Sequence, residues 1–357
     1  MNVLVISPYP REGASFRFRV LQYLPELERR GIHAETCCFL TSREFQHVHR
    51  PRGYLMKGKA VAAGTRRLIA ALARAKRFDA ILVHREVYPL GIEWFERWVG
   101  RLGVPVILDV DDAIFLPQPH SDPTRRRFHN PHKLVRLAVA SRLILVSNEY
   151  LGRWFRQHNA RVTVLPTTVD TEQFQPGPSP RQGGRLTIGW IGSPSTAGYF
   201  RQLLPVFKRL RERAAFDVKV VGAGSTLGAN GLPLIQVPWE LEREVEQFQS
   251  IDIGVYPLSH DEWAEGKGGF KSLQYMAVGI PVVASPVGVN CDIIRPGQNG
   301  FLASREEEWM EILGRLLQDA PLRQRVGQAG RQTVVERYAT AVHAPRLAAC
   351  LEEAVRS

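Results

Sequence analysis

The fold of this chain is decided by the stretch Gly266-Lys-Gly-Gly-Phe-Lys-Ser-Leu-Gln-Tyr-Met-Ala-Val-Gly-Ile-Pro-Val-Val-Ala-Ser285. Its first glycines precede a segment whose apolar spacing predicts a helix that begins near Phe270. Gly279 is expected to end this helix, because glycine readily adopts the left-handed conformation that follows a helix. Pro281 then opens an apolar run of strand type. A glycine loop, a helix and a buried strand in this order indicate one repeat of a parallel α/β sheet.

The start of this helix has the chemistry of a phosphate-binding site. Free N–H groups and the helix dipole attract anions to a helix N-terminus, here near Phe270. Gly268 and Gly269 would let a ligand approach the backbone closely. Lys267 and Lys271 add positive charge beside it. An ordinary loop and helix with exposed lysines remains the alternative, because one glycine-rich turn is weak evidence for a ligand.

Apolar runs alternate with helical patterns along the whole chain, which predicts an α/β fold with parallel strands. The expected strands are Val3–Ser7, Ala80–Val83, Pro105–Val110, Leu143–Ser147 and Val162–Pro166 in the first half, and Leu186–Ile191, Asp217–Gly222, Ile251–Tyr256 and Pro281–Ala284 in the second. A helix is expected from Phe18 to Arg30.

Residues 173–185 are rich in proline and glycine, so they are interpreted as a linker between two domains. We expect an N-terminal Rossmann-like domain at 1–172 and a C-terminal one at 186–340. Residues 341–357 are expected to form a helix that packs back towards the N-terminal domain. Both domains are expected to be doubly wound and to face a cleft, because ligands in such sheets bind beyond the carboxyl ends of the strands.

Composition restricts the class of protein. A chain of 357 residues agrees with two domains at about 100–200 residues each. No apolar run approaches the ~20 residues that cross a bilayer, and Met1–Pro8 is typical of a strand and not of a signal peptide. The four cysteines show neither metal spacing nor a disulfide framework. These features predict a cytoplasmic protein, while its oligomeric state has no signature in the sequence.

The formal charge of +12 is concentrated locally. No acidic residue occurs between Glu44 and Asp79, a segment that contains nine lysines and arginines. A second basic cluster spans Arg125–Lys133. Such charge favours an anionic partner, and we expect a membrane surface or an anionic acceptor. Nucleic acid is not expected, because aromatic residues do not interleave with the basic ones and no known nucleic-acid-binding module is present.

Within this basic segment, Thr65–Lys76 has the pattern of an amphipathic helix. Leu68, Ile69 and Leu72 are expected to share its apolar face, with arginines on another face. A basic amphipathic helix can rest on anionic lipid. The alternative is a surface helix of a Rossmann domain whose apolar face packs into the core.

The second half of the chain resembles a known family. The segment Leu273–Ser285 is similar to the donor-binding signature of family 4 glycosyltransferases, which belong to glycosyl transferases group 1 and have the GT-B fold. Further similar segments are Val164–Pro176, Val221–Gly224, Gln247–Pro257 and Gly297–Leu302. The resemblance implies that the C-terminal domain binds a nucleotide-diphosphate sugar and the N-terminal domain the acceptor. It also implies transfer with retention of configuration and without a metal or another cofactor.

Departures from the family pattern indicate a divergent branch. The family usually has two glutamates separated by seven residues, of which the second holds the ribose, and Gln274 occupies that second position. Glu265 lies one residue from the position of the first and is expected to replace it. The family also places an arginine and a lysine after the first strand of this domain, where Gly192 and Ser193 stand here and are expected to contact the donor. Lys267 is therefore expected to supply the missing charge, together with Lys271.

The resemblance also indicates site residues in the N-terminal half. His84 follows an apolar strand, where the family has a histidine that contacts the donor sugar near the reacting carbon; a structural histidine at a strand end is the alternative. Gly13 corresponds to the glycines of the first loop, which approach the donor phosphate or the acceptor. Arg17 and Arg19 are candidates for the cleft, as is Arg85 next to the histidine, although solvated arginines on a helix surface remain equally open.

The acidic motif Asp109-Val-Asp-Asp112 allows two interpretations. Carboxylates at a strand end can hold a divalent metal, as in GT-A glycosyltransferases. That fold lacks two Rossmann halves, so Asp111 and Asp112 are instead expected to line the cleft and contact acceptor hydroxyls.

The sequence thus predicts a metal-independent retaining glycosyltransferase whose acceptor is a lipid-linked or cell-surface glycan. Its catalytic candidates are His84 and Glu265. Two alternatives stay open: a nucleotide-sugar epimerase of the same fold, and a degenerate basic binding protein without catalysis.

Overall fold

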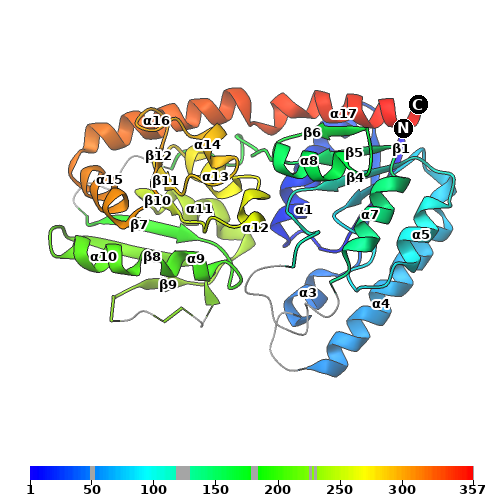
Figure 1. The fold of residues 1–357 in the computed structure, drawn as a ribbon, viewed down its shortest axis with the longest axis horizontal. Helices are drawn as coiled ribbons and strands as arrows, with labels where there is room; N and C mark the ends of the chain where they lie inside the picture. Colours follow the sequence, from blue (N-terminus) through cyan, green and yellow to red (C-terminus); the bar gives the residue numbers. More distant parts are fainter. Residues whose placement is uncertain (49–52, 118–128, 178–183, 225–226, 229–230, 357) are drawn as a thin grey trace. The chain divides into compact units, whose positions relative to one another are not determined.

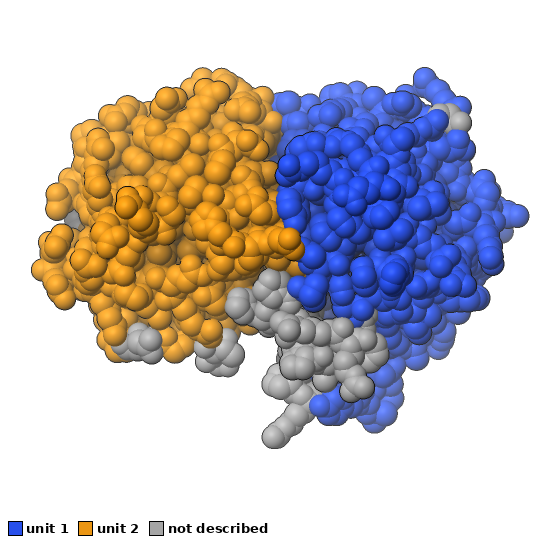
Figure 2. Space-filling model, in the orientation of Figure 1, with its two compact units in different colours: residues 1–167, 340–357 blue, residues 168–339 orange. Residues whose placement is uncertain are grey.

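The computed structural model describes residues 1–48, 53–117, 129–177, 184–224, 227–228 and 231–356. The chain forms two units (Figure 2): unit 1 contains Met1–Thr167 and Thr340–Ser357, and unit 2 contains Thr168–Ala339. Several residues to which the sequence drew attention lie outside the described part. They are Arg50 and Arg52 of the acid-free segment, 125–128 of the second basic cluster, and 178–183 of the expected linker.

Unit 1 is built on a sheet of parallel strands. Among the described residues it has six strands in the order β2-β1-β3-β4-β5-β6 (Figure 1). The strands are β1 (Asn2–Ser7), β2 (His33–Cys38), β3 (Ala80–His84), β4 (Val106–Val110), β5 (Leu143–Val146) and β6 (Val162–Val164). The helices are α1 (Ala14–Arg19), α2 (Leu24–Arg29), α3 (Ser42–Val48), α4 (Tyr54–Ala73), α5 (Trp94–Gly100), α7 (Pro131–Ala140), α8 (Glu149–Arg156) and α17 (Thr340–Arg356).

Helix α17 belongs to unit 1 although it ends the chain. It contacts α2, β3 and β4. Leu347 and Leu351 are buried in one apolar cluster with Val3, Val5 and Leu82 of the sheet. The burial of such side chains contributes about 1.5–3 kcal/mol each, so this helix is an integral part of the core of unit 1.

Unit 2 repeats this architecture. Its described strands form a parallel sheet in the order β12-β11-β10-β7-β8-β9. They are β7 (Leu186–Ile191), β8 (Phe216–Val221), β9 (Ile235–Val237), β10 (Ile253–Tyr256), β11 (Val282–Ala284) and β12 (Phe301–Leu302). The helices are α9 (Ala197–Arg201), α10 (Leu204–Arg211), α11 (Glu244–Gln249), α12 (Glu262–Glu265), α13 (Phe270–Ala277), α14 (Asn290–Ile293), α15 (Glu306–Gln318) and α16 (Ala320–Arg337).

The expected fold class is confirmed, and each strand expected from an apolar run is present. Three strands were not predicted, namely β2, β9 and β12. Strand β2 has the sequence HAETCC and none of its residues is fully buried. Strands β9 and β12 are edge strands of two or three residues. Sequence patterning detects buried apolar runs, so short or half-exposed edge strands escape it.

The single helix expected from Phe18 to Arg30 is wrong. The chain forms α1, a 3-10 turn at Leu21–Tyr23 and then α2. The regular helix is interrupted at Val20, whose φ of −129° is not helical. Pro25 lies in the first turn of α2, where its missing N–H breaks no hydrogen bond.

Helix α13 has the bounds that the glycines predict. Gly269 precedes it with a left-handed φ of +64°, and Gly279 follows it with a φ of +75°. A Cβ atom at Gly327 of α16 would lie 2.1 Å from the carbonyl oxygen of Gly279, so α16 packs against the end of α13 only because this residue is glycine.

Candidate active site

The winding direction of each sheet reverses at one point, the switch point. It lies between β1 and β3 in unit 1 and between β7 and β10 in unit 2. In unit 1 the chain passes from β1 to β2 on one side and from β3 to β4 on the other. In unit 2 it passes from β7 to β8 and from β10 to β11 in the same way. Ligands of doubly wound sheets bind at the carboxyl ends of the strands beside such a switch point. The candidate site residues lie at these two places.

A buried charged cluster lies at the switch point of unit 1. The Arg19 guanidinium contacts Asp109 at 2.5 Å, and their side chains are only 1% and 3% exposed. His84 ends β3 without any exposed surface, and its Nδ1 lies 2.9 Å from Asp109 Oδ2. Because an ionised carboxylate only accepts hydrogen bonds, Nδ1 carries the proton and donates to it. Asp109 therefore fixes the ring orientation of His84.

The charges of this cluster depend on one another. Burial alone would raise the pKa of the Asp109 carboxyl, but the charge of Arg19 and the hydrogen bonds from His84 and Arg19 hold this pKa below its ordinary value. Burial would likewise lower the pKa of Arg19, and the charge of Asp109 raises it instead. Because Arg19 is buried and its guanidinium is bonded to Asp109, it lies in the interior of unit 1, and its proposed place in a cleft is wrong.

Ser15 connects His84 to the acidic motif. Its hydroxyl lies 2.8 Å from His84 Nε2 and donates to Asp111 Oδ2 at 2.5 Å. Ser15 was not a predicted site residue, because a serine in the first turn of a short helix has no recognisable spacing. Its position at the start of the first helix after β1 is the signal that could have identified it.

Arg85 has the only positive φ of a non-glycine residue among the described residues, at 68°. This conformation is uncommon for an arginine and costs on the order of 1–3 kcal/mol, which the surroundings must offset. The Arg85 Nε lies 3.1 Å from Asp111 Oδ1, and its terminal nitrogen contacts Asp112. Burial alone would raise the pKa of Asp111, and the nearby Arg85 charge lowers it below the ordinary value. Arg85, Asp111 and Asp112, which are all predicted site residues, therefore form one ion-paired group.

The three aspartates of the motif are thus paired with guanidinium groups. Asp109 pairs with Arg19, whereas Asp111 and Asp112 pair with Arg85. In the part of the chain that the structure describes, no three His, Cys, Asp or Glu side chains are arranged to hold a metal ion.

Gly13 and Arg17 lie on the loop and helix that carry Ser15. A Cβ atom at Gly13 would lie 2.6 Å from the Tyr9 Cβ, so the loop closes on Tyr9 only with glycine at this position. Arg17 is half-buried, its guanidinium lies 4.8 Å from the centre of the Phe18 ring, and it donates to the carbonyl oxygen of Arg11 at 3.4 Å. The proposed contacts of Gly13 and Arg17 with a ligand stay predictions.

At the switch point of unit 2, the loop after β7 packs against the loop after β8. A Cβ atom at Gly222 would lie 2.4 Å from the carbonyl oxygen of Gly192. The Ser193 hydroxyl lies 2.9 Å from that of Ser195 and 3.2 Å from that of Thr196. The loop therefore presents hydroxyl groups where the resemblance led us to expect an arginine and a lysine.

The N-terminus of α13 lies in the loop between β10 and β11, which borders the same switch point. Gly269 has no side chain with which to cap the helix, and Lys267 and Lys271 lie on either side of it. The Lys271 ammonium is 5.1 Å from the centre of the Phe270 ring and 5.3 Å from that of Phe248. The start of α13 therefore has backbone N–H groups, with half-buried Gly268 and two lysines close to it in the chain.

Gln274 and Glu265 differ in how the structure places them. Gln274 has no exposed surface; its amide oxygen accepts a hydrogen bond from Lys271 Nζ at 2.8 Å, and its Nε2 donates to Glu244 Oε1 at 3.4 Å. It thus acts on Lys271, and its contact with a ribose stays a prediction. Glu265 is half-buried at the end of α12, two residues before Lys267, and its role is likewise a prediction.

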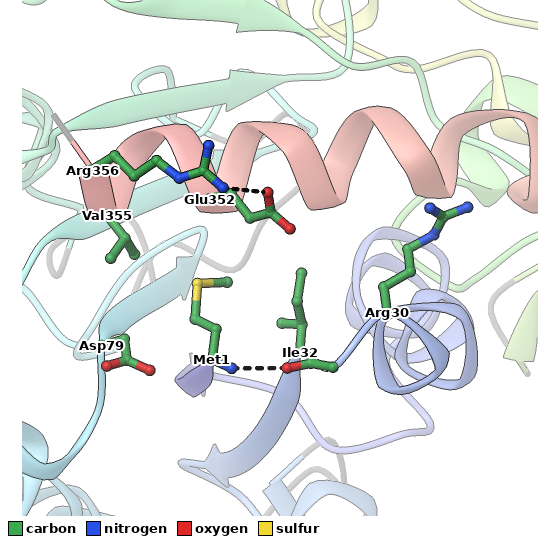
Figure 3. Close-up of a pocket in the computed structure, with 8 residues that line it drawn as sticks. Met1, Arg30, Ile32, Asp79, Glu352, Val355 and Arg356 are labelled. Carbon is green, nitrogen blue, oxygen red and sulfur yellow. Dashed lines mark hydrogen bonds and ion pairs between the residues drawn. The ribbon is translucent and has the colours of Figure 1, made fainter.

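A pocket of about 360 Å³ lies away from these residues (Figure 3). Met1 and Ile32 precede β1 and β2, and Asp79 precedes β3, so the pocket is at the amino ends of the strands of unit 1. The Met1 ammonium donates to the carbonyl oxygen of Gly31 at 2.8 Å, and Arg356 pairs with Glu352 at the end of α17. Because ligands of such sheets bind at the opposite edge, we do not assign this pocket to the candidate site.

Two doubly wound parallel units, with polar residues at the switch point of each, define the GT-B class of fold. A family model described as "Glycosyl transferases group 1" matches residues 185–319. This segment belongs to that family, so the resemblance recognised from the sequence is confirmed. The narrower placement in family 4 stays a prediction.

One curated relative is D-inositol 3-phosphate glycosyltransferase of Stackebrandtia nassauensis, which is 25% identical over 225 residues. The alignment covers 53% of this chain and 49% of the relative, so the chain spans about half the length of the curated relative it matches.

Solved structures with the same fold cover nearly the whole chain. Sucrose-phosphate synthase from Thermosynechococcus elongatus superimposes with a TM-score of 0.72 at 14% identity and covers 99% of this chain and 98% of its own. The Anabaena protein HepE, in complex with UDP and glucose, has a TM-score of 0.68 at 15% identity and covers 99% of this chain and 100% of its own. At this identity the likeness establishes the GT-B fold.

Proposed function

We propose that the chain is a retaining glycosyltransferase of family 4 that moves a sugar from a nucleotide-diphosphate donor to an acceptor hydroxyl. One observation carries this proposal: helix α13 begins at a left-handed glycine beside a switch point, between Lys267 and Lys271, in the segment that matches the family. Such a helix end is suited to a diphosphate. Unit 2 would hold the donor, and unit 1 the acceptor.

The diphosphate is the part of the donor whose negative charge grows as the glycosidic bond breaks. The first N–H groups of α13 and the ammonium groups of Lys267 and Lys271 would stabilise this charge, each good donor by about 3–4 kcal/mol. Gln274 holds the Lys271 ammonium by a hydrogen bond, so less reorganisation is needed when the ligand binds. Ser193 and its neighbouring hydroxyls would complete the site with neutral donors.

The buried cluster of unit 1 would position the reacting groups. His84 would steer the donor sugar, with its ring held by Asp109 and Ser15. Asp111 and Asp112 would accept hydrogen bonds from acceptor hydroxyls, with Arg85 holding both carboxylates in place. The two lysines would supply the positive charge of the donor site, so metal independence forms part of the proposal.

UDP-sugars are the first candidates for the donor, because HepE, which shares this fold, was solved with UDP and glucose. The acceptor is proposed to be a hydroxyl of a lipid-linked or cell-surface glycan. Incubation of the protein with a UDP-sugar and an acceptor is expected to release UDP and form a glycoside with the donor's anomeric configuration. Formation of an epimer from the donor alone would support the epimerase instead, and an inverted product would contradict retention.

The exposed residues of helix α4 favour the proposal that the protein binds its acceptor at a membrane surface. One face of α4 is buried through Leu68 and Leu72, as in an ordinary surface helix. Ile69 was expected on that face, and this expectation is wrong, because Ile69 is 41% exposed. A second, outward face therefore also carries apolar side chains.

This outward face combines apolar and basic side chains. Tyr54 and Leu55 at the first turn are 83% and 73% exposed, and Met56 is 50% exposed. Lys59 and Arg66 lie along the same exposed side, and the sequence of α4 contains no acidic residue. Within the described residues, no helix is long and apolar enough to cross a bilayer. We propose that α4 lies on the surface of an anionic membrane, on the cytoplasmic side, through this face.

Flotation with vesicles tests this surface. Leu55→Asp should lower binding to vesicles that contain phosphatidylglycerol by at least about tenfold, because a buried leucine contributes about 1.5–3 kcal/mol. The double variant Lys59→Glu and Arg66→Glu should lower it by about 30-fold or more, since each basic residue contributes about 1 kcal/mol.

The matched control is Val139→Asp on a different helix, α7, a substitution of an apolar residue that is 65% exposed. It should leave flotation unchanged. Equal flotation of all variants, or binding to neutral phosphatidylcholine as strong as to the anionic vesicles, would disprove the membrane surface.

A further inference from the structure

Tyr275 of α13 reaches into the central sheet of unit 2 at the switch point. Its side chain has no exposed surface. Its hydroxyl donates a hydrogen bond to the carbonyl oxygen of Gly189 at 3.1 Å and accepts one from the N–H of Ile191 at 3.0 Å. Both backbone groups belong to β7, so a side chain of the donor-signature helix is bonded directly to the strand that leads into the Gly192–Thr196 loop.

These two bonds lie where the pairing of β7 with β10 ends. The register between the two strands includes Ile188 with Ile253 and Gly189 with Gly254, and stops there. On its other side, β7 pairs with β8 as far as Ile191. Continuing the ladder to β10 would require the N–H of Ile191. That N–H is bonded to the Tyr275 hydroxyl instead, so β7 and β10 separate at their carboxyl ends.

The neighbouring residues make room for this tyrosine. A Cβ atom at Gly254 would lie 2.4 Å from the Tyr275 ring, so β10 can pass the ring only with glycine there. The Phe248 ring meets it edge to face at 5.0 Å. Burial raises the pKa of the Tyr275 hydroxyl, which therefore stays protonated and available as a donor. The tyrosine thus has one fixed position between the strands.

We infer that Tyr275 is a positioning residue that holds the switch point of unit 2 open and fixes the Gly192–Thr196 loop relative to the N-terminus of α13. Lys271 lies four residues before Tyr275 and so on the same side of the helix. One rigid helix then carries both the ammonium group proposed for the diphosphate and the hydroxyl that anchors the loop on the other side of the switch point. The inference rests on the proposed function, because the Gly192–Thr196 loop and the N-terminus of α13 would both bind one nucleoside diphosphate.

The test removes only the hydroxyl. Tyr275→Phe should raise the dissociation constant for UDP, measured by calorimetry well below the melting temperature, by about tenfold or more, since small displacements of positioned groups have effects of this size. Hydrogen–deuterium exchange of the peptide that spans Ile191–Thr196 should become faster. Gly254→Ala, which displaces the ring and keeps the hydroxyl, should produce both changes. Tyr23→Phe, at a buried tyrosine of unit 1, is the matched control and should produce neither.

A purely structural tyrosine gives a different result. If Tyr275→Phe lowers the melting temperature but leaves both the UDP affinity and the exchange of the loop unchanged, the inference is overturned. If the wild-type protein does not bind UDP, the proposed uridine donor fails, and loop exchange alone decides the role of Tyr275. Faster exchange in Tyr275→Phe then supports the anchoring role, and exchange equal to that of the wild type overturns it.

Discussion

Asp109→Asn is expected to lower the free energy of unfolding of unit 1 by about 3–5 kcal/mol, because it removes the carboxylate that is bonded to the buried Arg19 guanidinium and leaves that charge uncompensated. Within the described residues, the bonds of the Arg19 guanidinium go to Asp109 and to the carbonyl oxygen of Leu165. The same substitution weakens the hold on His84, whose Nδ1 donates to Asp109. Both effects act on the centre of the unit 1 sheet.

Hydrogen–deuterium exchange of the β3 and β4 peptides is the appropriate measurement, because a chain of two units need not unfold in one step. Protection of these strands should fall by about two to three and a half orders of magnitude, at 1.4 kcal/mol for each factor of ten. The matched control is Glu149→Gln, which breaks an exposed ion pair with Arg156 and should change stability by less than about 1 kcal/mol. Equal effects of the two substitutions would contradict the account of the cluster.

The pH dependence of this effect has a definite sign. The pKa of Asp109 is lower in the folded protein than its ordinary value of 3.8. A depressed pKa stabilises the folded state above the ordinary value, and this contribution is lost as the pH falls through the folded-state pKa. The difference between the wild type and Asp109→Asn should therefore be complete at pH 7 and diminish only below pH 3.8.

Lys271→Ala should lower the turnover number for sugar transfer by about 10²–10³, the usual effect of removing one donor to a developing oxyanion. The lysine is proposed to stabilise the leaving diphosphate, so the loss should appear in the turnover number and in the affinity for UDP. Gln274 also loses a hydrogen-bond partner in this variant, so its melting temperature is measured in parallel.

Lys208→Ala provides the matched control, because Lys208 is an exposed lysine of α10 in the same unit. It removes one positive charge from unit 2 without touching α13. If Lys208→Ala reduced transfer as much as Lys271→Ala, the effect would come from net charge. If Lys271→Ala kept full affinity and turnover, Lys271 would have no part in the site.

Local sequence patterns predicted most of the fold and the start of α13. Gly269 and Gly279 sit at left-handed positions that few other residues adopt, so they mark the ends of the helix within the sequence itself. The apolar runs mark the buried strands because strands that are covered on both faces consist mainly of apolar residues. Edge strands such as β2 bury little, so their residue pattern carries almost no signal.

The partners within the site could not be predicted in this way. The link from Asp109 through His84 to Ser15 joins positions up to 94 residues apart in the chain, and only the sheet topology brings them together. Gln274 shows the same limit: no spacing indicated its neighbour Glu244, beside which packing against α11 buries it. Ile69 was assigned to the wrong face, because the sequence of a helix with apolar residues on two faces does not show which of them is buried.

The central claim is that unit 2 binds the diphosphate of a nucleotide sugar, and thermal unfolding with candidate donors tests it most directly. UDP-, GDP-, ADP- and TDP-sugars are compared at millimolar concentration on the wild type and on Lys271→Ala. A donor at 100 times its dissociation constant stabilises the folded protein by about 2.7 kcal/mol, so one of them should raise the melting temperature of the wild type and have much less effect on the variant. A wild-type melting temperature that none of the four donors changes would contradict the claim.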